Sequence, residues 1–163
     1  MTEEDARALQ SDRDKLEAQV AAHPFLIGIS AHHIRLLADC AMGSRFRAGE
    51  VIFSENEPAN RFYLIERGRV ALESSTLDES VKIDEIGDGD LLGWSWLFPP
   101  YVWHFSAWAL EDTTAIFFYG TVLRDYCEKD HSLGLELFKR MSAVMLRRLQ
   151  AARRKLLNVH QSR

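Results

Sequence analysis

Cysteine is scarce in this sequence, as are long apolar runs and any excess of positive charge. The two cysteines, Cys40 and Cys127, lie far apart without Cys-x-x-Cys spacing or clustered histidines, so we predict free thiols rather than a disulfide or a metal site. No apolar run approaches membrane-spanning length, and the first five residues are acidic where a signal peptide would be basic. We therefore expect a cytoplasmic protein without membrane contact. The net charge of −4 gives no general attraction to nucleic acid.

Recognisable catalytic motifs are also missing. The sequence has no Gly-x-Ser-x-Gly elbow, no spaced pair of histidine and acid, and no glycine-rich phosphate loop ending in Gly-Lys-Ser or Gly-Lys-Thr. His32 and His33 are adjacent in a predicted helix, and adjacent helical residues point in different directions, so solvated or hydrogen-bonded imidazoles are favoured over metal ligands. We expect no enzymatic activity, no metal and no resident cofactor.

The periodicity of the chain predicts an α+β domain. An N-terminal helix over residues 1–22 ends at His23-Pro24, and a shorter helix follows Ser30. From Arg45 the pattern changes to short strand-like runs separated by turn residues, which is typical of an antiparallel β-roll or jelly-roll-like barrel. The expected strands lie at 45–47, 51–53, 62–65, 70–72, 81–83, 105–110 and 115–118. Helical periodicity returns for a short helix at 121–127 and a long one that starts at Asp130 or Ser132 and runs to about Val159.

The most informative stretch runs from Gly89 to Phe98 and is followed by Pro99-Pro100. Two glycines, large apolar residues and a double proline predict a short helical turn between two strands, a suitable place for a ligand. The stretch contains no Lys or Arg to neutralise a phosphate.

The order of elements and several turn motifs resemble the cyclic-nucleotide-binding domain. The resemblance rests on Phe46 to Phe53, on Glu55-x-Glu57-Pro58-Ala59, on Phe62 to Val70, on Gly87-x-Gly89-Asp90-Leu91-Leu92-Gly93, on Ser106-Ala107-x-Ala109 and on Met145 to Leu149. It implies a regulatory sensor of the class found in catabolite-activator and fumarate-nitrate-type regulators. Residues 23–160 would form this domain, with the roll at 45–119 and the C-terminal helices at 121–159.

The resemblance also implies where a ligand would bind. In the family, a Gly-Glu pair and an Arg-Ser or Arg-Thr pair before Ala hold the ribose and the cyclic phosphate. Here Gly93 and Ser106 keep their places, but Trp94 replaces the Glu and Phe105 replaces the Arg. The candidate ligand-binding residues are Gly93, Trp94, Ser95, Trp96, His104, Phe105, Ser106 and Ala107. A weak site for cyclic nucleotide, a site for another small ligand, and a pocket plugged by its own aromatic rings all stay open; Arg61 and Arg69 are further candidates to reach inward.

The last predicted helix carries an apolar seam at spacings of three and four. Its members are Phe138, Met141, Met145, Leu149, Ala152, Leu156 and Val159. Such a seam covers a domain face or pairs with a second copy, so a partner protein or a homodimer is expected there. The basic residues near the helix end are predicted to be a solvated face rather than a DNA-binding one, since no helix-turn-helix follows.

Three hypotheses follow from the sequence. The first is a stand-alone sensor whose cassette and long helix act together; the second is a ligand-free dimerisation or interaction module. The third is a DNA-associated regulator, or a fragment of a transcription regulator related to the catabolite activators.

Overall fold

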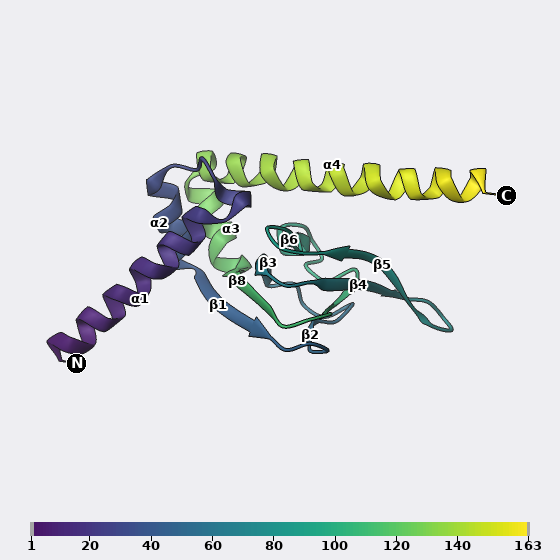
Figure 1. Cartoon of the computed structure of the whole chain (residues 1–163). Helices are drawn as coiled ribbons and strands as arrows, with labels where there is room; N and C mark the ends of the chain where they lie inside the picture. Colours follow the sequence, from purple (N-terminus) through teal and green to yellow (C-terminus); the bar gives the residue numbers. More distant parts are fainter. Residues whose placement is uncertain (1, 163) are drawn as a thin grey trace.

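The structure is a computed structural model that describes residues 2–162, and it shows a β-roll flanked by helices at one end and along a second side (Figure 1). The helices are α1 (Glu3–Ala22), α2 (Ala31–Asp39), α3 (Gly120–Lys129) and α4 (His131–Gln161), with short 3-10 turns η1 (Pro24–Leu26) and η2 (Ser95–Leu97). The strands are β1 (Ala41–Phe46), β2 (Val51–Phe53), β3 (Arg61–Arg67), β4 (Val70–Ser75), β5 (Ser80–Ile86), β6 (Leu91–Leu92), β7 (Ser106–Ala109) and β8 (Thr113–Tyr119). The predicted α+β class and the antiparallel roll are confirmed.

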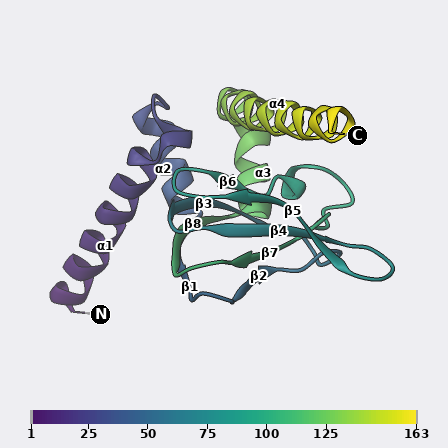
Figure 2. The same ribbon diagram turned by 45° about the vertical axis from the view of Figure 1, so that its right-hand side comes forward.

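Two four-stranded antiparallel sheets form the roll, in the orders β1-β8-β3-β6 and β2-β7-β4-β5 (Figure 2). Successive residues of a strand point to opposite faces, and β3 shows what this does here. Phe62 and Leu64 pack among the helices, whereas Tyr63 and Ile65 pack in the interior of the roll. Strand β3 is therefore buried on both faces, which explains its nearly continuous apolar run.

The helix boundaries follow local capping chemistry. Thr2 and Asp5 form a reciprocal capping box at the start of α1, and the helix ends at His23 before Pro24, as predicted. Along α1 only Val20 is buried, and Figure 1 shows the helix projecting away from the roll. Asp130 caps α4 by accepting hydrogen bonds from the backbone N–H groups of Ser132 and Leu133.

The first strand begins earlier than predicted. It starts at Ala41, whose register partner is Phe118, and not at Arg45. Met42 and Gly43 are exposed, so the apolar alternation that marks a strand is missing from these positions. Pairing with β8 thus determines the start of β1. Within residues 2–162, no helix is both long and apolar enough to cross a membrane.

Candidate functional site

The candidate site lies in the segment from Gly93 to Ala107, which we call the cassette. It leaves the first sheet after β6, forms η2 and enters the second sheet at β7. The expected helical turn between two strands is therefore confirmed, although it is a single 3-10 turn of three residues.

Gly93 fits its place because a tryptophan ring lies directly against it. Its φ is +88°, a left-handed conformation that glycine adopts without strain. A Cβ at this position would lie 2.6 Å from Cζ3 of Trp103. The glycine thus allows the Trp103 ring to pack against the backbone of the cassette.

Stacked aromatic rings fill the interior of the roll beneath the cassette. Trp103 is buried and stacks on Phe53, with ring centroids 3.8 Å apart and planes 9° from parallel. Phe53 in turn lies 5.7 Å from Phe105 and 6.2 Å from Tyr63, centroid to centroid. Five clefts on residues 2–162 have no lining residue between 92 and 108.

The other cassette aromatics belong to the helix-side core. Trp96 is fully buried and stacks on Phe62 at 5.3 Å, while its indole Nε1 has no hydrogen-bond partner. Trp94 is half-buried against the same core, and Ser95 is buried. The predicted site residues are thus divided between two cores and do not line one pocket.

The polar side chains of the cassette are hydrogen-bonded within the protein or exposed to solvent. The Ser106 hydroxyl accepts a hydrogen bond of 2.9 Å from the Glu55 backbone N–H, and Ala107 is buried in the roll. The His104 side chain is exposed. Ser106 therefore already has a partner within the protein.

Of the two arginines that are candidates to reach inward, Arg61 contacts the interior core of the roll through Phe117, whereas Arg69 does not. Arg69 is bound to Glu85 across strands β4 and β5 of the second sheet, and the pKa of Glu85 lies below its usual value because its carboxylate accepts hydrogen bonds from Lys82 and from Arg69. Arg61 lies over the Phe117 ring, 4.4 Å from its centroid.

Arg148 of α4 is predicted from the sequence to lie on the solvated basic face of the last helix, but this prediction is wrong, because the residue is half-buried and reaches the cassette. Its Nη2 donates to the Leu91 carbonyl, and its guanidinium lies 5.1 Å from the centroid of the Trp94 ring. Burial lowers the pKa of Arg148, while Asp90 and Asp84 act in the opposite direction. Arg148 follows Leu137, Met141 and Val144 at helical spacing, so a charged residue on a buried stripe is the signal that could have identified it.

Two apolar faces run along α4. Leu133, Leu137, Met141 and Val144 are buried against the domain, so Met141 belongs to this inner face and not to the predicted seam. The other predicted members are accessible, and with Leu135 they form what we call the outer stripe: Leu135, Phe138, Met145, Leu149, Ala152, Leu156 and Val159. The sequence could not separate the two faces because Met141 lies three residues from Phe138 and four from Met145.

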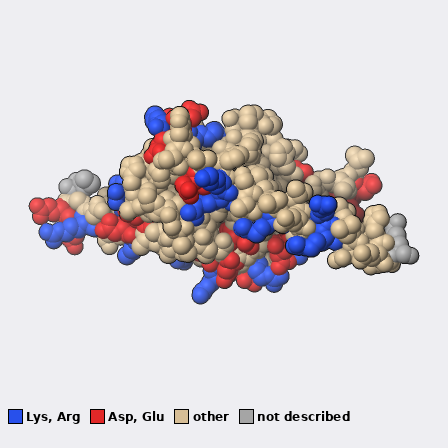
Figure 3. Space-filling view, turned by 90° about the horizontal axis from the view of Figure 1, so that it is seen from above, with Lys and Arg blue, Asp and Glu red and all other residues tan. Residues whose placement is uncertain are grey.

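Beyond Arg148, α4 runs past the helical core and alongside β4 and β5 (Figure 1). From Arg147 onward, the exposed basic residues of α4 are Arg147, Arg153, Arg154 and Lys155. Seen from above in Figure 3, Lys and Arg groups are spread between uncharged areas of the surface rather than merged into one basic face. Lys155 comes within 3.7 Å of Asp84, which offsets part of its charge locally.

Comparison with protein families identifies the class. The model of the cyclic nucleotide-binding domain matches residues 44–130, more than half of the chain. The protein belongs to this family of regulatory domains, as its two-sheet roll and flanking helices indicate.

Solved structures with a similar fold include cyclic nucleotide-binding proteins. A protein from Geobacter metallireducens GS-15, described as a cyclic nucleotide-binding protein, is 26% identical over 82% of this chain and 97% of its own, with a TM-score of 0.74. A cyclic nucleotide-binding domain from Methylobacillus flagellatus KT is 17% identical over 89% and 84%, with a TM-score of 0.77.

The regulatory subunit of a cAMP-independent protein kinase A from Trypanosoma cruzi, bound to guanosine, is 23% identical over 72% of this chain and 42% of its own, with a TM-score of 0.63. Comparison with curated proteins gives no match.

Proposed function

We propose that this chain is a regulatory domain that has lost the usual hold on cyclic nucleotides and acts through α4, as a homodimer. The observation that carries the proposal is the contact of Arg148 with both Leu91 and Trp94, since it joins the cassette directly to the helix with the outer stripe. A conformational change in the cassette would therefore be transmitted directly to α4, without an intermediate element.

The loss of the cyclic nucleotide site follows from three residues. Trp94 and Phe105 stand where the family has its Glu and Arg, and neither can make a charge-assisted hydrogen bond. Each such bond contributes about 1.5–3 kcal/mol, so the two together correspond to roughly 10²- to 10⁴-fold in affinity. Trp103, stacked on Phe53, further fills the interior behind Gly93.

The outer stripe supports a homodimer as the output. From Met145 to Val159 its residues recur at alternating spacings of four and three, the pattern of a helix that pairs with another helix. Leu149 and Leu156 are each 66% exposed, and no residue from 149 to 161 is buried. An isolated helical segment of this length is marginal in water, so pairing would stabilise it.

Sedimentation equilibrium of the full chain tests this function with two matched variants. Leu156 and Leu157 are neighbours with similar exposure, 66% and 57%, but only Leu156 lies on the outer stripe. We expect the wild type and Leu157→Glu to be dimers at micromolar concentration and Leu156→Glu to be a monomer. A monomeric wild type, or equal effects of the two variants, would contradict the proposal.

A nucleoside without a phosphate is the second candidate. The cassette offers aromatic surface and no cation, and the T. cruzi relative is bound to guanosine. Uptake would require Trp103 to leave its stack on Phe53. Calorimetric titration with guanosine and adenosine tests this candidate, and the absence of saturable heat with either nucleoside would argue against it.

A further inference from the structure

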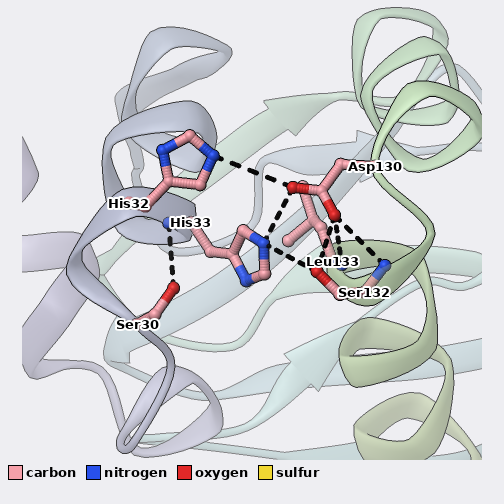
Figure 4. A network of polar contacts seen from close by, with 6 residues as sticks. All are labelled: Ser30, His32, His33, Asp130, Ser132 and Leu133. Carbon is pink, nitrogen blue, oxygen red and sulfur yellow. Dashed lines mark hydrogen bonds and ion pairs between the residues drawn. The ribbon is translucent and has the colours of Figure 1, made fainter.

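The first turn of α2 and the start of α4 meet at a small polar cluster. His33 Nε2 lies 2.9 Å from Asp130 Oδ2, and His32 Nε2 lies 3.8 Å from the same oxygen. The three ligand atoms all lie within 4.8 Å of one another. Figure 4 shows both imidazoles turned toward the carboxylate.

Adjacent helical residues are expected to point in different directions, so the convergence of these two histidines on one carboxylate was not predicted from the sequence. His33 is almost buried, and its backbone N–H is held by the Ser30 hydroxyl that caps α2. His32 approaches from solvent, with its side chain 65% exposed. The rings tilt toward one another, with centroids 5.5 Å apart, because a single acceptor lies between them.

Asp130 is oriented by its own capping role. Its Oδ1 accepts from the backbone N–H groups of Ser132 and Leu133 and, at 2.6 Å, from the Ser132 hydroxyl. These bonds fix the carboxylate plane and leave Oδ2 directed at the two histidines. Metal-binding carboxylates are commonly held by such outer hydrogen bonds.

We propose that His32, His33 and Asp130 bind a divalent transition metal of the zinc type. Imidazole nitrogens with one carboxylate suit zinc and its neighbours rather than magnesium or calcium. Bonds of about 2.0–2.2 Å in a tetrahedral site place ligand atoms about 3.3 Å apart, which lies between the two observed separations from Asp130. The exposed His32 side chain is free to move toward the ion until its nitrogen is at bonding distance. A water molecule fills the fourth coordination position.

The bound ion would join α2 to the first turn of α4. At present His33 makes this connection by its hydrogen bond to Asp130 and by its contact with the Ser132 hydroxyl at 3.2 Å. A metal would add His32 to the connection and fix the start of the helix that carries the outer stripe.

The test titrates ZnCl₂ into chelator-treated full chain by calorimetry and CoCl₂ by visible absorption. We expect one ion per chain, a tetrahedral cobalt spectrum and a higher Tm in zinc. His32→Ala should weaken binding at least about tenfold, because removing even an outer partner of a metal site costs 10–100-fold. Asp130→Asn should do the same while keeping α4 capped, since Asn caps a helix as well as Asp.

His160→Ala is the matched control, because His160 is an exposed histidine in the last turn of the same helix. It should bind zinc as the wild type does. The proposal is overturned if the wild type takes up no zinc at micromolar concentration, or if His32→Ala and Asp130→Asn bind as tightly as the wild type, which would place the ion elsewhere.

Discussion

Arg148 on α4 and Trp94 in the cassette are in direct contact, which joins a charged side chain of the long helix to an aromatic ring of the candidate site. The guanidinium lies 5.1 Å from the ring centroid and is anchored by the Leu91 carbonyl. Cation–π contacts and hydrogen bonds strengthen when they are shielded from water, and this pair is half-buried on both sides.

Replacing Arg148 with Ala should destabilise the fold. Loss of the charge-assisted bond and of the contact with Trp94 is expected to cost about 1–3 kcal/mol in the free energy of unfolding. Arg147→Ala is the control, because Arg147 is an exposed neighbour and should change stability by no more than about 0.5 kcal/mol. Urea denaturation followed by fluorescence measures both, and equal midpoints would show that the contact contributes nothing.

Gly93→Ala should lower the free energy of unfolding by more than the backbone strain alone would. A left-handed non-glycine residue costs about 1–2 kcal/mol, and overpacking against the Trp103 ring adds about 1–3 kcal/mol. Gly49 has the same φ of +88° but open space around its Cβ position, so Gly49→Ala reports the backbone cost by itself. If the two variants unfold at the same denaturant concentration, the ring does not press on Gly93.

Stability should fall as the pH drops below about 6.5 because of His23. Burial lowers the pKa of His23 from its ordinary value of 6.5. Its Nδ1 accepts from the Phe25 N–H and its Nε2 donates to the Ile65 carbonyl, an arrangement that fits the neutral ring.

The sign follows from proton binding. Below pH 6.5 His23 binds a proton in the unfolded chain but stays neutral in the folded chain. The free energy of unfolding therefore decreases as the pH falls, by at most about 1.4 kcal/mol per pH unit. Thermal unfolding of His23→Gln between pH 5 and 7 should show a smaller slope than the wild type. An unchanged slope would assign the effect to other groups.

Both thiols should react slowly with alkylating reagents. Burial raises the pKa of Cys40 to about 12 and that of Cys127 to about 11, so little thiolate exists at neutral pH. Mass spectrometry after iodoacetamide treatment at pH 8 should find both unmodified in the folded protein and modified in denaturant. Rapid labelling of the native chain would show that these sites open easily.

The fold was largely predictable because its signals are local. Turn glycines, the Thr2 and Ser30 caps and the switch from period 2 to period 3.6 each depend on a few neighbouring residues. The free state of both cysteines was also predicted and is confirmed. The start of β1 was missed because pairing with β8, and not the pattern at Met42 and Gly43, defines it.

The candidate site was predicted only in part, since its contacts are long-range. Trp94 and Phe105 were recognised as departures, but nothing local shows that Trp103 stacks on Phe53 fifty residues away in the chain. The same holds for Arg148 and Leu91, and for His32 and Asp130, which meet only once α2 and α4 are packed. The sequence likewise could not place Met141 on the inner face of α4.

The central claim is that aromatic residues have replaced the hold on cyclic nucleotides in the cassette. Isothermal titration of the full chain with cyclic AMP tests it most directly, at concentrations up to about 1 mM. We predict no saturable heat, because Trp94 and Phe105 offer no charged partner and Trp103 fills the interior. Saturable binding of one cyclic AMP per chain with a micromolar Kd would contradict the account.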